Sequence, residues 1–534
     1  MSPLRSVPRL RDRTSGVLLH PTSLPGPHGN GDLGEEARRF ADFLAMAGQR
    51  WWQMLPVAPP GYGNSPYSAQ SAFAGSPMLL SLDALAAEGL LLPEELLVDF
   101  ARERVDFAQA SELRARLLGV AFARFREKTQ KTAKTRAPFR VFCEKNRAWL
   151  DDFALFRAIK RASGDVQWTL WESDLKLRKP AALERARLAL KDAIDLERFT
   201  QFAFARQFDA LRTYCADRSI GLIGDIPIFV AHDSADVWQH QDMFRLDAGG
   251  EPTVISGVPP DYFSTTGQRW GNPLYRWARL RKSGYAWWVA RFRAMLERFD
   301  AVRIDHFIGF QRYWEIPASE TTAVNGRWMK GPGAHFFETV EKELGRLPLI
   351  AEDLGAVTPA VTALRDRFRL PGIKVLQFAF GTDPSASNFL PHNYPKRAVV
   401  YTGTHDNDTT LGWFNEKGGE ASTRSAEQAE KERAAVLSYL ASDGREVNWD
   451  MIRATLASVA RVAIVPLQDV LGLGSEARMN RPGVASDNWT WRFSEWDLTH
   501  AVAERLFRLT ETYGRASDAH AHATSAALHT GAAE

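Results

Sequence analysis

Eight short apolar segments, separated by stretches with a helical pattern, constrain the fold of this 534-residue chain most strongly. Short apolar runs rich in β-branched residues are typical of strands that are buried on both faces. Strands that alternate with helices form parallel sheets. The eight segments are GVLLHPTSL (16–24), RWWQMLPV (50–57), IGLIGDIPIFV (220–230), AVRIDHFIGF (301–310), LPLIAEDLG (347–355), IKVLQFAF (373–380), AVVYTGTHD (398–406) and VAIVPLQDVLG (462–472).

Eight such strands predict an α/β fold, a closed (β/α)8 or TIM barrel, which we expect to occupy residues 14–512. An open, doubly wound sheet is the alternative that this alternation allows. No glycine motif of the kind that cradles phosphate opens any of the helical stretches. In a barrel, the chemistry takes place where the carboxyl ends of the strands meet. Polar residues that follow the eight segments are therefore the first candidates for a functional site.

The uneven spacing of the segments predicts insertions in the barrel. The long gap between the second and third segments contains ELRARLLGVAFARFREK and ERARLALKDAIDLERFTQFAFARQFDALRTY, which carry the i, i+3, i+4 period of a helix. We therefore expect a mainly helical insertion at residues 81–215. Residues 231–290 are rich in proline, glycine and aromatic residues, which predicts a long ordered loop over the barrel mouth. The small, polar residues of 515–534 predict a disordered tail.

Charge and cysteine content argue against several classes of partner and site. Lys and Arg number 67 against 64 Asp and Glu, and this net charge of +3, spread along the chain, predicts no nucleic-acid or membrane partner. Two cysteines, Cys143 and Cys215, cannot build a disulfide framework or a cysteine-rich zinc site. The chain has no apolar run of membrane-spanning length, and its first residues lack the apolar stretch of a secretory signal. We expect a soluble, cytoplasmic protein.

Three acidic residues share a position that suggests catalysis. Asp305 follows VRI, Glu352 follows PLIA and Asp406 follows TGTH, so each ends a predicted strand and all three would meet at one barrel mouth. Convergent carboxylates without a Cys or His cluster favour glycosyl transfer over metal hydrolysis. One carboxylate attacks or stabilises the anomeric carbon, and a protonated one donates to the leaving oxygen. We expect neither a metal nor a cofactor.

The alternative is that these acids have structural roles. An aspartate after a strand is often a helix cap or an ion-pair partner, and the acids at 352–353 and 406–408 could each be caps. Arg303, two residues before Asp305, would point to the same side of its strand and orient the carboxylate as a nucleophile requires. His405 could hydrogen-bond sugar hydroxyls, although a lone buried histidine is more often part of the core.

Further motifs accompany the three acids along almost the whole chain, from about residue 14 to about residue 512. They are VRIDHF, IAEDLG, THDND, GYGNSPYSAQSAFAGSP (61–77), GDIPIFVAHDSADVW (224–238), GVPPDYFSTTGQRWGNPLY (257–275) and QDVLGLGSEARMNRPG followed by NWTWR (468–492). Together they resemble the motifs of the 4-α-glucanotransferases, also called amylomaltases or disproportionating enzymes. These enzymes belong to the α-amylase clan of retaining enzymes.

The resemblance implies a role for each acid. Asp305 is expected to be the nucleophile that forms a covalent glucosyl-enzyme, Glu352 the general acid and then the base, and Asp406 the residue that stabilises the distorted sugar. The residues to which the resemblance assigns substrate binding are Tyr62, Asp225, Trp270, Asn272, Arg303 and His405. Two of them have structural alternatives, because Tyr62 lies between two glycines in a turn-like sequence and Trp270 could simply anchor its loop.

The resemblance also implies a reaction, the transfer of α-1,4-glucan segments between maltooligosaccharides or amylose. Glucose or a maltooligosaccharide would be the acceptor, and cyclic glucans would arise by intramolecular transfer. The acceptor must outcompete water, and the loop that carries Tyr262, Phe263 and Trp270 is the expected cover. The alternatives are an α-1,4-glucan hydrolase and a non-catalytic glucan-binding protein on the same scaffold. The complete set of acids argues against the latter, because binding needs no proton donor.

Overall fold

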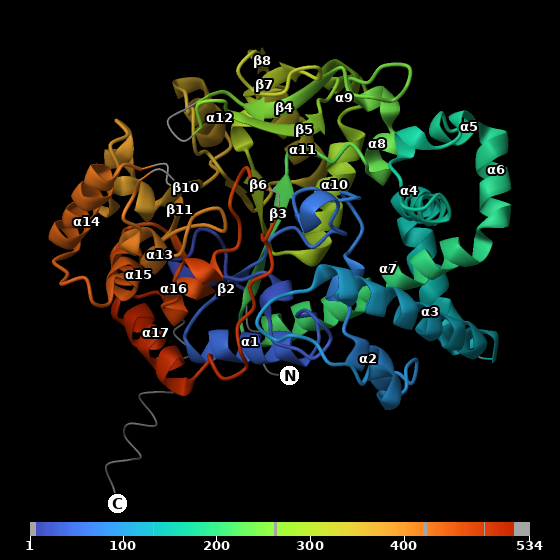
Figure 1. Cartoon of the computed structure of the whole chain (residues 1–534), viewed down its shortest axis with the longest axis horizontal. Helices are drawn as coiled ribbons and strands as arrows, with labels where there is room; N and C mark the ends of the chain where they lie inside the picture. The colour runs from blue at the N-terminus through green and yellow to red at the C-terminus, as the bar shows by residue number, and fades with distance from the viewer. Residues whose placement is uncertain (1–6, 132, 261–263, 420–423, 485, 517–534) are drawn as a thin grey trace, which may run out of the picture.

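A closed barrel of eight parallel strands forms the centre of the computed structural model, which describes residues 7–131, 133–260, 264–419, 424–484 and 486–516 (Figure 1). Around the barrel the strands follow one another in chain order, and β1 pairs with β12 to close it. The strands are β1 (Thr14–Leu18), β2 (Trp51–Gln53), β3 (Gly221–Pro227), β6 (Ala301–Asp305), β9 (Leu349–Ala351), β10 (Gly372–Val375), β11 (Ala398–Tyr401) and β12 (Val462–Pro466).

Each of the eight apolar segments overlaps one barrel strand, so the predicted (β/α)8 fold is confirmed and the open, doubly wound sheet is wrong. The strands form in short, largely apolar stretches, and β3 and β6 also carry the charged residues Asp225, Arg303 and Asp305. All five residues of β12, for example, are buried. This is the pattern of a strand that packs against side chains of the barrel interior on one face and against helices on the other.

Helices surround the barrel, and α17, α1, α7, α10 and α11 pack against one another in that order. None of the helices in the described part of the chain combines the length and the apolar character needed to cross a membrane. The helices that follow the barrel strands are α1 (Glu35–Met46), α7 (Lys191–Asp217), α10 (Ala286–Arg298), α11 (Ala334–Leu344), α12 (Pro359–Arg367), α13 (Thr410–Asn415), α14 (Ala426–Leu440), α15 (Val447–Ala457), α16 (Leu467–Leu471) and α17 (His500–Thr512).

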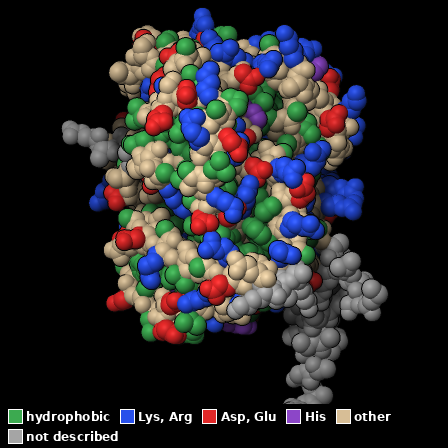
Figure 2. All heavy atoms as spheres, turned by 90° about the vertical axis from the view of Figure 1, so that its right-hand side faces the viewer, with side chains coloured by type: hydrophobic (Ala, Val, Ile, Leu, Met, Phe, Trp, Pro, Cys, Tyr) green, Lys and Arg blue, Asp and Glu red, His purple; other side chains and the backbone are tan. Residues whose placement is uncertain are grey.

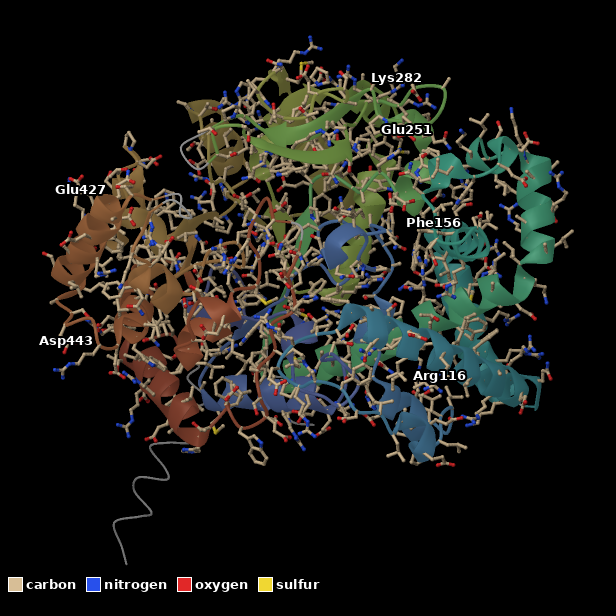
Figure 3. The ribbon with its side chains drawn as sticks, viewed as in Figure 1. Arg116, Phe156, Glu251, Lys282, Glu427 and Asp443 are labelled. Atoms are coloured by element: carbon tan, nitrogen blue, oxygen red, sulfur yellow. The ribbon has the colours of Figure 1, made fainter. Side chains whose placement is uncertain are left out.

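A helical projection extends from one side of the barrel between β2 and β3 (Figure 1). Its helices are α2 (Leu82–Ala87), α3 (Phe107–Lys131), α4 (Ala133–Ala162), α5 (Ser173–Lys176) and α6 (Pro180–Ala189). Phe156 of α4 lies inside the projection, packed against the rings of Trp171 and Trp238, whereas Arg116 of α3 is exposed (Figure 3). The surface on this side of the molecule mixes basic and acidic side chains (Figure 2).

The helical insertion expected at residues 81–215 includes one helix that belongs to the barrel. α7 packs against α1, α10 and β3, so it is the barrel helix that precedes β3. Its i, i+3, i+4 pattern is the same as that of the projecting helices, because both kinds bury an apolar face. The boundary therefore could not be placed from periodicity alone.

The segment 231–290, expected as a long loop, contains regular structure, and the prediction of a loop is wrong there. Strands β4 (Val254–Val258) and β5 (Gln268–Pro273) join β7 (Arg312–Pro317) and β8 (Arg327–Lys330) in an antiparallel sheet of order β5-β4-β7-β8. Helices α8 (Ala235–Gln239) and α9 (Trp277–Lys282) flank β4 and β5 in the chain, and α10 begins at Ala286. The local pattern could not reveal the sheet, because half of its strands come from a later part of the chain.

Two arginines join the ends of the described chain beneath the barrel. The side chain of Arg515 is fully buried, so the prediction of a tail that begins at 515 is wrong for this residue; residues 517–534 lie outside the described part. Arg13 donates hydrogen bonds to the carbonyl oxygens of Leu456, Ser458 and Ala460, which also accept hydrogen bonds from Arg515. The carbonyl oxygens that accept hydrogen bonds from Arg515 are those of Thr14, Leu456, Ser458, Ala460 and Arg461.

Replacement of Arg515 by methionine should destabilise the fold by about 3 kcal/mol, because the hydrogen bonds from one buried guanidinium to five carbonyl groups are lost together. The loss should appear as a lower Tm in thermal unfolding followed by circular dichroism. Arg11→Met, which changes an exposed arginine near the same end of the barrel, is the matched control and should leave Tm nearly unchanged. Equal Tm values for the two variants would contradict this account.

Candidate active site

The carboxyl ends of three adjacent barrel strands, β3, β6 and β9, bring four charged side chains together. In the register of β3 and β6, Asp225 lies opposite Arg303 and Pro227 lies opposite Asp305. Glu352 is the first residue after β9, and its backbone N–H donates to the carbonyl of Ile304 in β6 at 3.1 Å. Parallel strands end at the same mouth, so the two acids predicted from separate segments become neighbours.

The guanidinium of Arg303 stands between two carboxylates. Its Nη1 lies 2.7 Å from Oδ2 of Asp225 and 3.0 Å from Oδ1 of Asp305. Burial lowers the pKa of Arg303, but the nearby Asp225 and Asp305 outweigh it and raise that pKa well above the ordinary value. Tyr67 donates its hydroxyl proton to the same oxygen of Asp225 at 2.7 Å. The Asp305 carboxylate is therefore held by a fixed, charged frame.

Glu352 occupies a different environment, although it lies on the neighbouring strand. Its side chain is buried, and each carboxyl oxygen accepts one backbone N–H: that of His306 at 2.7 Å and that of Leu354 at 3.0 Å. Burial, which is only partly opposed by Arg303 and is reinforced by Asp305, raises the pKa of Glu352 to about 8. This carboxyl group is protonated at neutral pH and can give up its proton.

Asp406 and His405 follow β11 on the far side of the mouth. The Asp406 side chain is about half exposed, and its Oδ1 accepts a hydrogen bond from the side chain of Asn480 at 2.6 Å. His405 is buried, with its ring stacked on that of Tyr67 at 5.1 Å between centroids and its Nε2 3.4 Å from Oδ2 of Asp406. Asp406 therefore presents an oriented carboxylate that solvent, or a sugar, can reach.

The structural roles considered for these acids fall instead to their neighbours. Asp353 accepts a hydrogen bond from the backbone N–H of Ile373 and pairs with Arg365, which joins β9 to β10 and α12. The N-cap of α13 is Thr409, whose side chain accepts the N–H of Gly412. Neither Glu352 nor Asp406 is a helix cap, so both carboxyl groups are available at the mouth.

The antiparallel sheet brings β5 to the edge of this site. Trp270 of β5 is 38% exposed, and its ring stands perpendicular to that of His306, with 4.8 Å between centroids. The Asn272 amide is engaged within the protein: it donates to the carbonyl of Val230 at 3.1 Å and accepts from the Ser256 hydroxyl at 3.2 Å. The loop residues Tyr262 and Phe263 lie outside the described residues.

Of the two tyrosines in the GYGNSPY motif, Tyr67 and not Tyr62 reaches the carboxylates. Tyr62 lies in the short 3-10 helix η2 (Tyr62–Asn64) and is 83% exposed. Tyr67 contacts Asp225 and His405, but nothing in the local sequence distinguishes it from Tyr62. Sequence reasoning likewise missed His306, although it lies next to Asp305, and Asn480, which is brought to Asp406 by a loop that follows β12.

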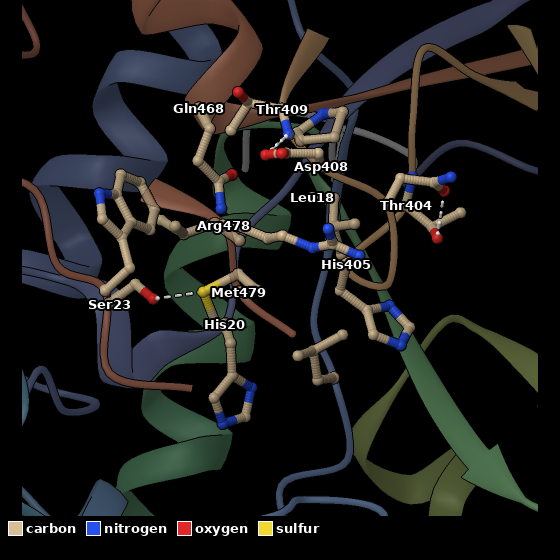
Figure 4. Close-up of a pocket in the computed structure, with 15 residues that line it drawn as sticks. Leu18, His20, Ser23, Thr404, His405, Asp408, Thr409, Gln468, Arg478 and Met479 are labelled. Atoms are coloured by element: carbon tan, nitrogen blue, oxygen red, sulfur yellow. Dashed lines mark hydrogen bonds between the residues drawn. The ribbon is translucent and has the colours of Figure 1, made fainter. Parts of the chain in front are cut away.

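A small pocket, partly open to solvent, lies beside His405 at the ends of β1, β11 and β12. Figure 4 shows His20, Gln468 and Arg478 on its wall. Burial, reinforced by His405, lowers the pKa of His20 to about 3, so this histidine is neutral at neutral pH. Arg478 of this wall donates a hydrogen bond to the backbone carbonyl of Asp406 at 2.8 Å.

Comparison with known proteins assigns the chain to a family. Residues 19–499 match the glycoside hydrolase 77 family, described as 4-alpha-glucanotransferase. A 4-alpha-glucanotransferase of Thermus thermophilus is 50% identical over 511 residues, which cover 94% of this chain and 99% of the relative. A chloroplastic/amyloplastic 4-alpha-glucanotransferase of Solanum tuberosum is 43% identical, with coverage of 94% and 86%.

A solved structure agrees with these sequence relatives. The amylomaltase of Streptococcus agalactiae, determined in complex with acarbose, superposes with a TM-score of 0.89 at 35% identity and covers 95% of this chain and 100% of its own. The chain therefore belongs to the 4-α-glucanotransferase family, glycoside hydrolase family 77.

Proposed function

We propose that this chain transfers α-1,4-glucan segments between maltooligosaccharides or amylose chains by two successive displacements that retain the anomeric configuration. One observation carries the proposal: Asp305 is paired with Arg303, whereas burial raises the pKa of the neighbouring Glu352 to about 8. Two adjacent carboxyl groups are thus kept in different environments. Retaining glycosyl transfer requires such a pair, one group as nucleophile and one as acid.

In the first displacement, Glu352 gives its proton to the glycosidic oxygen while that oxygen leaves the anomeric carbon. The Asp305 carboxylate forms a bond to the same carbon from the opposite face, which yields a covalent glucosyl ester. Arg303, whose Nη1 lies 3.0 Å from Oδ1 of Asp305, orients the carboxylate for this attack. The shortened glucan, now a free alcohol, leaves through the acceptor side of the mouth.

In the second displacement, the direction of proton transfer reverses. The hydroxyl group of an acceptor glucan attacks the anomeric carbon, the ester bond to Asp305 breaks, and Glu352 takes the hydroxyl proton. The backbone N–H groups of His306 and Leu354 stabilise the ionised Glu352 during this step, because hydrogen bonds to a carboxylate favour its charged form. The same residue therefore serves as acid and then as base.

Asp406, Asp225 and His405 are proposed to bind the sugar that undergoes transfer. Asp406 is oriented by Asn480 and accessible, which suits a carboxylate that accepts hydrogen bonds from ring hydroxyls. The ring of His405 is fixed by its stacking on Tyr67. Because these bonds strengthen as the sugar flattens toward the transition state, they contribute to rate as well as to binding.

Transfer prevails over hydrolysis only when an acceptor glucan is held better than water. Trp270 offers a partly exposed aromatic face beside His306 on the acceptor side. A sugar stacked there would raise the effective concentration of its hydroxyl group at the glucosyl-enzyme. The proposed substrates are therefore donors and acceptors of the same chemical class, with cyclic glucans as products when both ends belong to one chain.

Incubation of the purified protein with maltotriose should test transfer directly. The proposed reaction yields glucose and a ladder of longer maltooligosaccharides, while the number of reducing ends stays constant. Chromatographic resolution of the products, together with a reducing-end assay, measures both quantities. A rise in reducing ends without longer products would instead establish a hydrolase, and the absence of any product from maltotriose and maltoheptaose would indicate a binding protein.

Tyr67→Phe should lower kcat/KM by about tenfold to a hundredfold, because a hydrogen bond to a charged group is lost from Asp225. The matched control is Tyr214→Phe, which removes a tyrosine hydroxyl that donates to Asp42 at 2.9 Å at the surface. The control should keep wild-type kinetics. Initial rates of glucose release from maltotriose check both variants, and an equal effect in the two would contradict the role given to Tyr67.

A further inference from the structure

His306 fixes one oxygen of Glu352 through the backbone. Its N–H donates to Oε2 of Glu352 at 2.7 Å, and the next residue, Phe307, donates its N–H to the backbone carbonyl of Glu352 at 3.0 Å. The segment that follows Asp305 is therefore attached to Glu352 at two points. The orientation of the His306 peptide sets where the Glu352 carboxyl group lies.

That orientation depends on a left-handed backbone conformation. His306 has φ of 50° and ψ of 51°, a region that residues other than glycine seldom occupy and that the surroundings must hold in place. The His306 carbonyl accepts the N–H of Gly309 at 2.9 Å. A Cβ atom at Gly309 would lie 3.2 Å from Cδ2 of His306 and 2.7 Å from Cδ1 of Ile228, so glycine there makes room for the ring.

The imidazole of His306 acts by packing and not by charge. Its Nε2 is buried and has no hydrogen-bond partner among the described residues. Burial, only partly opposed by Asp305, lowers the pKa of His306 to about 4, so the ring is neutral at neutral pH. Its ring contact is with Trp270, which meets it edge to face.

Trp270 is placed to transmit the presence of an acceptor. It lies on β5, an edge strand of the antiparallel sheet, and its indole N–H donates to the side chain of Gln268 at 3.1 Å, which orients the ring. The ring is 38% exposed, and its contact with His306 places it near Glu352. A sugar that stacks on Trp270 therefore presses on the residue whose N–H holds the Glu352 carboxyl group.

We propose that His306 is a positioning residue that couples acceptor binding at Trp270 to the orientation of Glu352. The inference rests on the proposed function. An occupied acceptor site then favours the arrangement in which Glu352 accepts the proton of the attacking hydroxyl. With the site empty, the His306 peptide is less firmly held, and water is activated less well.

The coupling has a signature in the pH dependence of the reaction. The groups that face Glu352 are Arg303 and Asp305 on β6, Tyr401 on β11 and the neutral His306. The first displacement needs protonated Glu352, so kcat/KM of the wild type should fall as pH rises through about 8. A weaker hydrogen bond from the His306 N–H favours the protonated form, which should move this fall to higher pH.

The test compares His306→Ala, Trp270→Ala and the double variant in the maltotriose assay. Each single change should lower transfer by about tenfold or more, move the fall in kcat/KM to higher pH, and reduce the ratio of transfer to hydrolysis. The double variant should lose no more transfer activity than the less active single variant, because each single change already removes the same contact between His306 and Trp270. Additive losses, or losses without a shift in the pH profile, would overturn the coupling.

Two further variants distinguish the effect of the His306 ring from an effect of its backbone conformation and from that of changing a surface tryptophan. His306→Asn keeps a residue that tolerates the left-handed conformation but removes the ring, so it should behave like His306→Ala. Wild-type kinetics in His306→Asn would overturn the role of the contact with Trp270. Trp496→Ala, which changes a tryptophan that is 78% exposed, should leave all parameters unchanged.

The wild-type product ladder distinguishes failure of this inference from failure of the proposed function. If the wild type transfers glucosyl units and the His306 and Trp270 variants match it, only the coupling is wrong. If the wild type transfers nothing, the proposed function and the coupling fail together. Trp270→Ala, which changes a partly exposed side chain, keeps the test decisive even if His306→Ala does not fold.

Discussion

The buried guanidinium of Arg303 between two carboxylates is the interaction on which the site depends. Removal of a charge from water is costly, and such a group is stable in the barrel only because Asp225 and Asp305 both compensate it. The pairing follows from strand register, since Asp225 lies opposite Arg303 and Asp305 is two residues further along β6. A shift of one residue between β3 and β6 would turn these side chains to the other face and abolish the frame.

Glu352 follows the neighbouring strand β9, but its environment is the opposite of that of Asp305. No side-chain cation pairs directly with its carboxyl group among the described residues, and burial outweighs its two backbone donors. Glycosyl transfer needs this contrast, because one acid must attack while the other carries a proton. The antiparallel sheet brings Trp270 to the edge of the site, where its ring contacts His306, whose N–H donates to Glu352.

The sequence predicts the parts of this architecture that local physics determines. Each barrel strand lies in a short, largely apolar stretch, so all eight strands could be identified, and an acid at the end of such a stretch must lie at the mouth. Features that depend on contacts between distant segments of the chain could not be predicted from the sequence. The strands β7 and β8, the choice of Tyr67 over Tyr62, and the hydrogen bond from Asn480 to Asp406 all arise from contacts across the fold. Arg515 was missed because a single arginine in a polar stretch carries no sign of burial.

The central claim is that Asp305 becomes covalently glucosylated, and a trapping experiment tests it most directly. Glu352→Gln should still react with α-glucosyl fluoride, whose leaving group needs no proton, but should resolve the ester slowly because it lacks a base. Rapid denaturation, proteolysis and mass spectrometry would then locate the added sugar. The account predicts one glucosyl group on the peptide that contains Asp305, at that side chain. Fluoride release without any labelled peptide, or a label on another carboxylate, would contradict it.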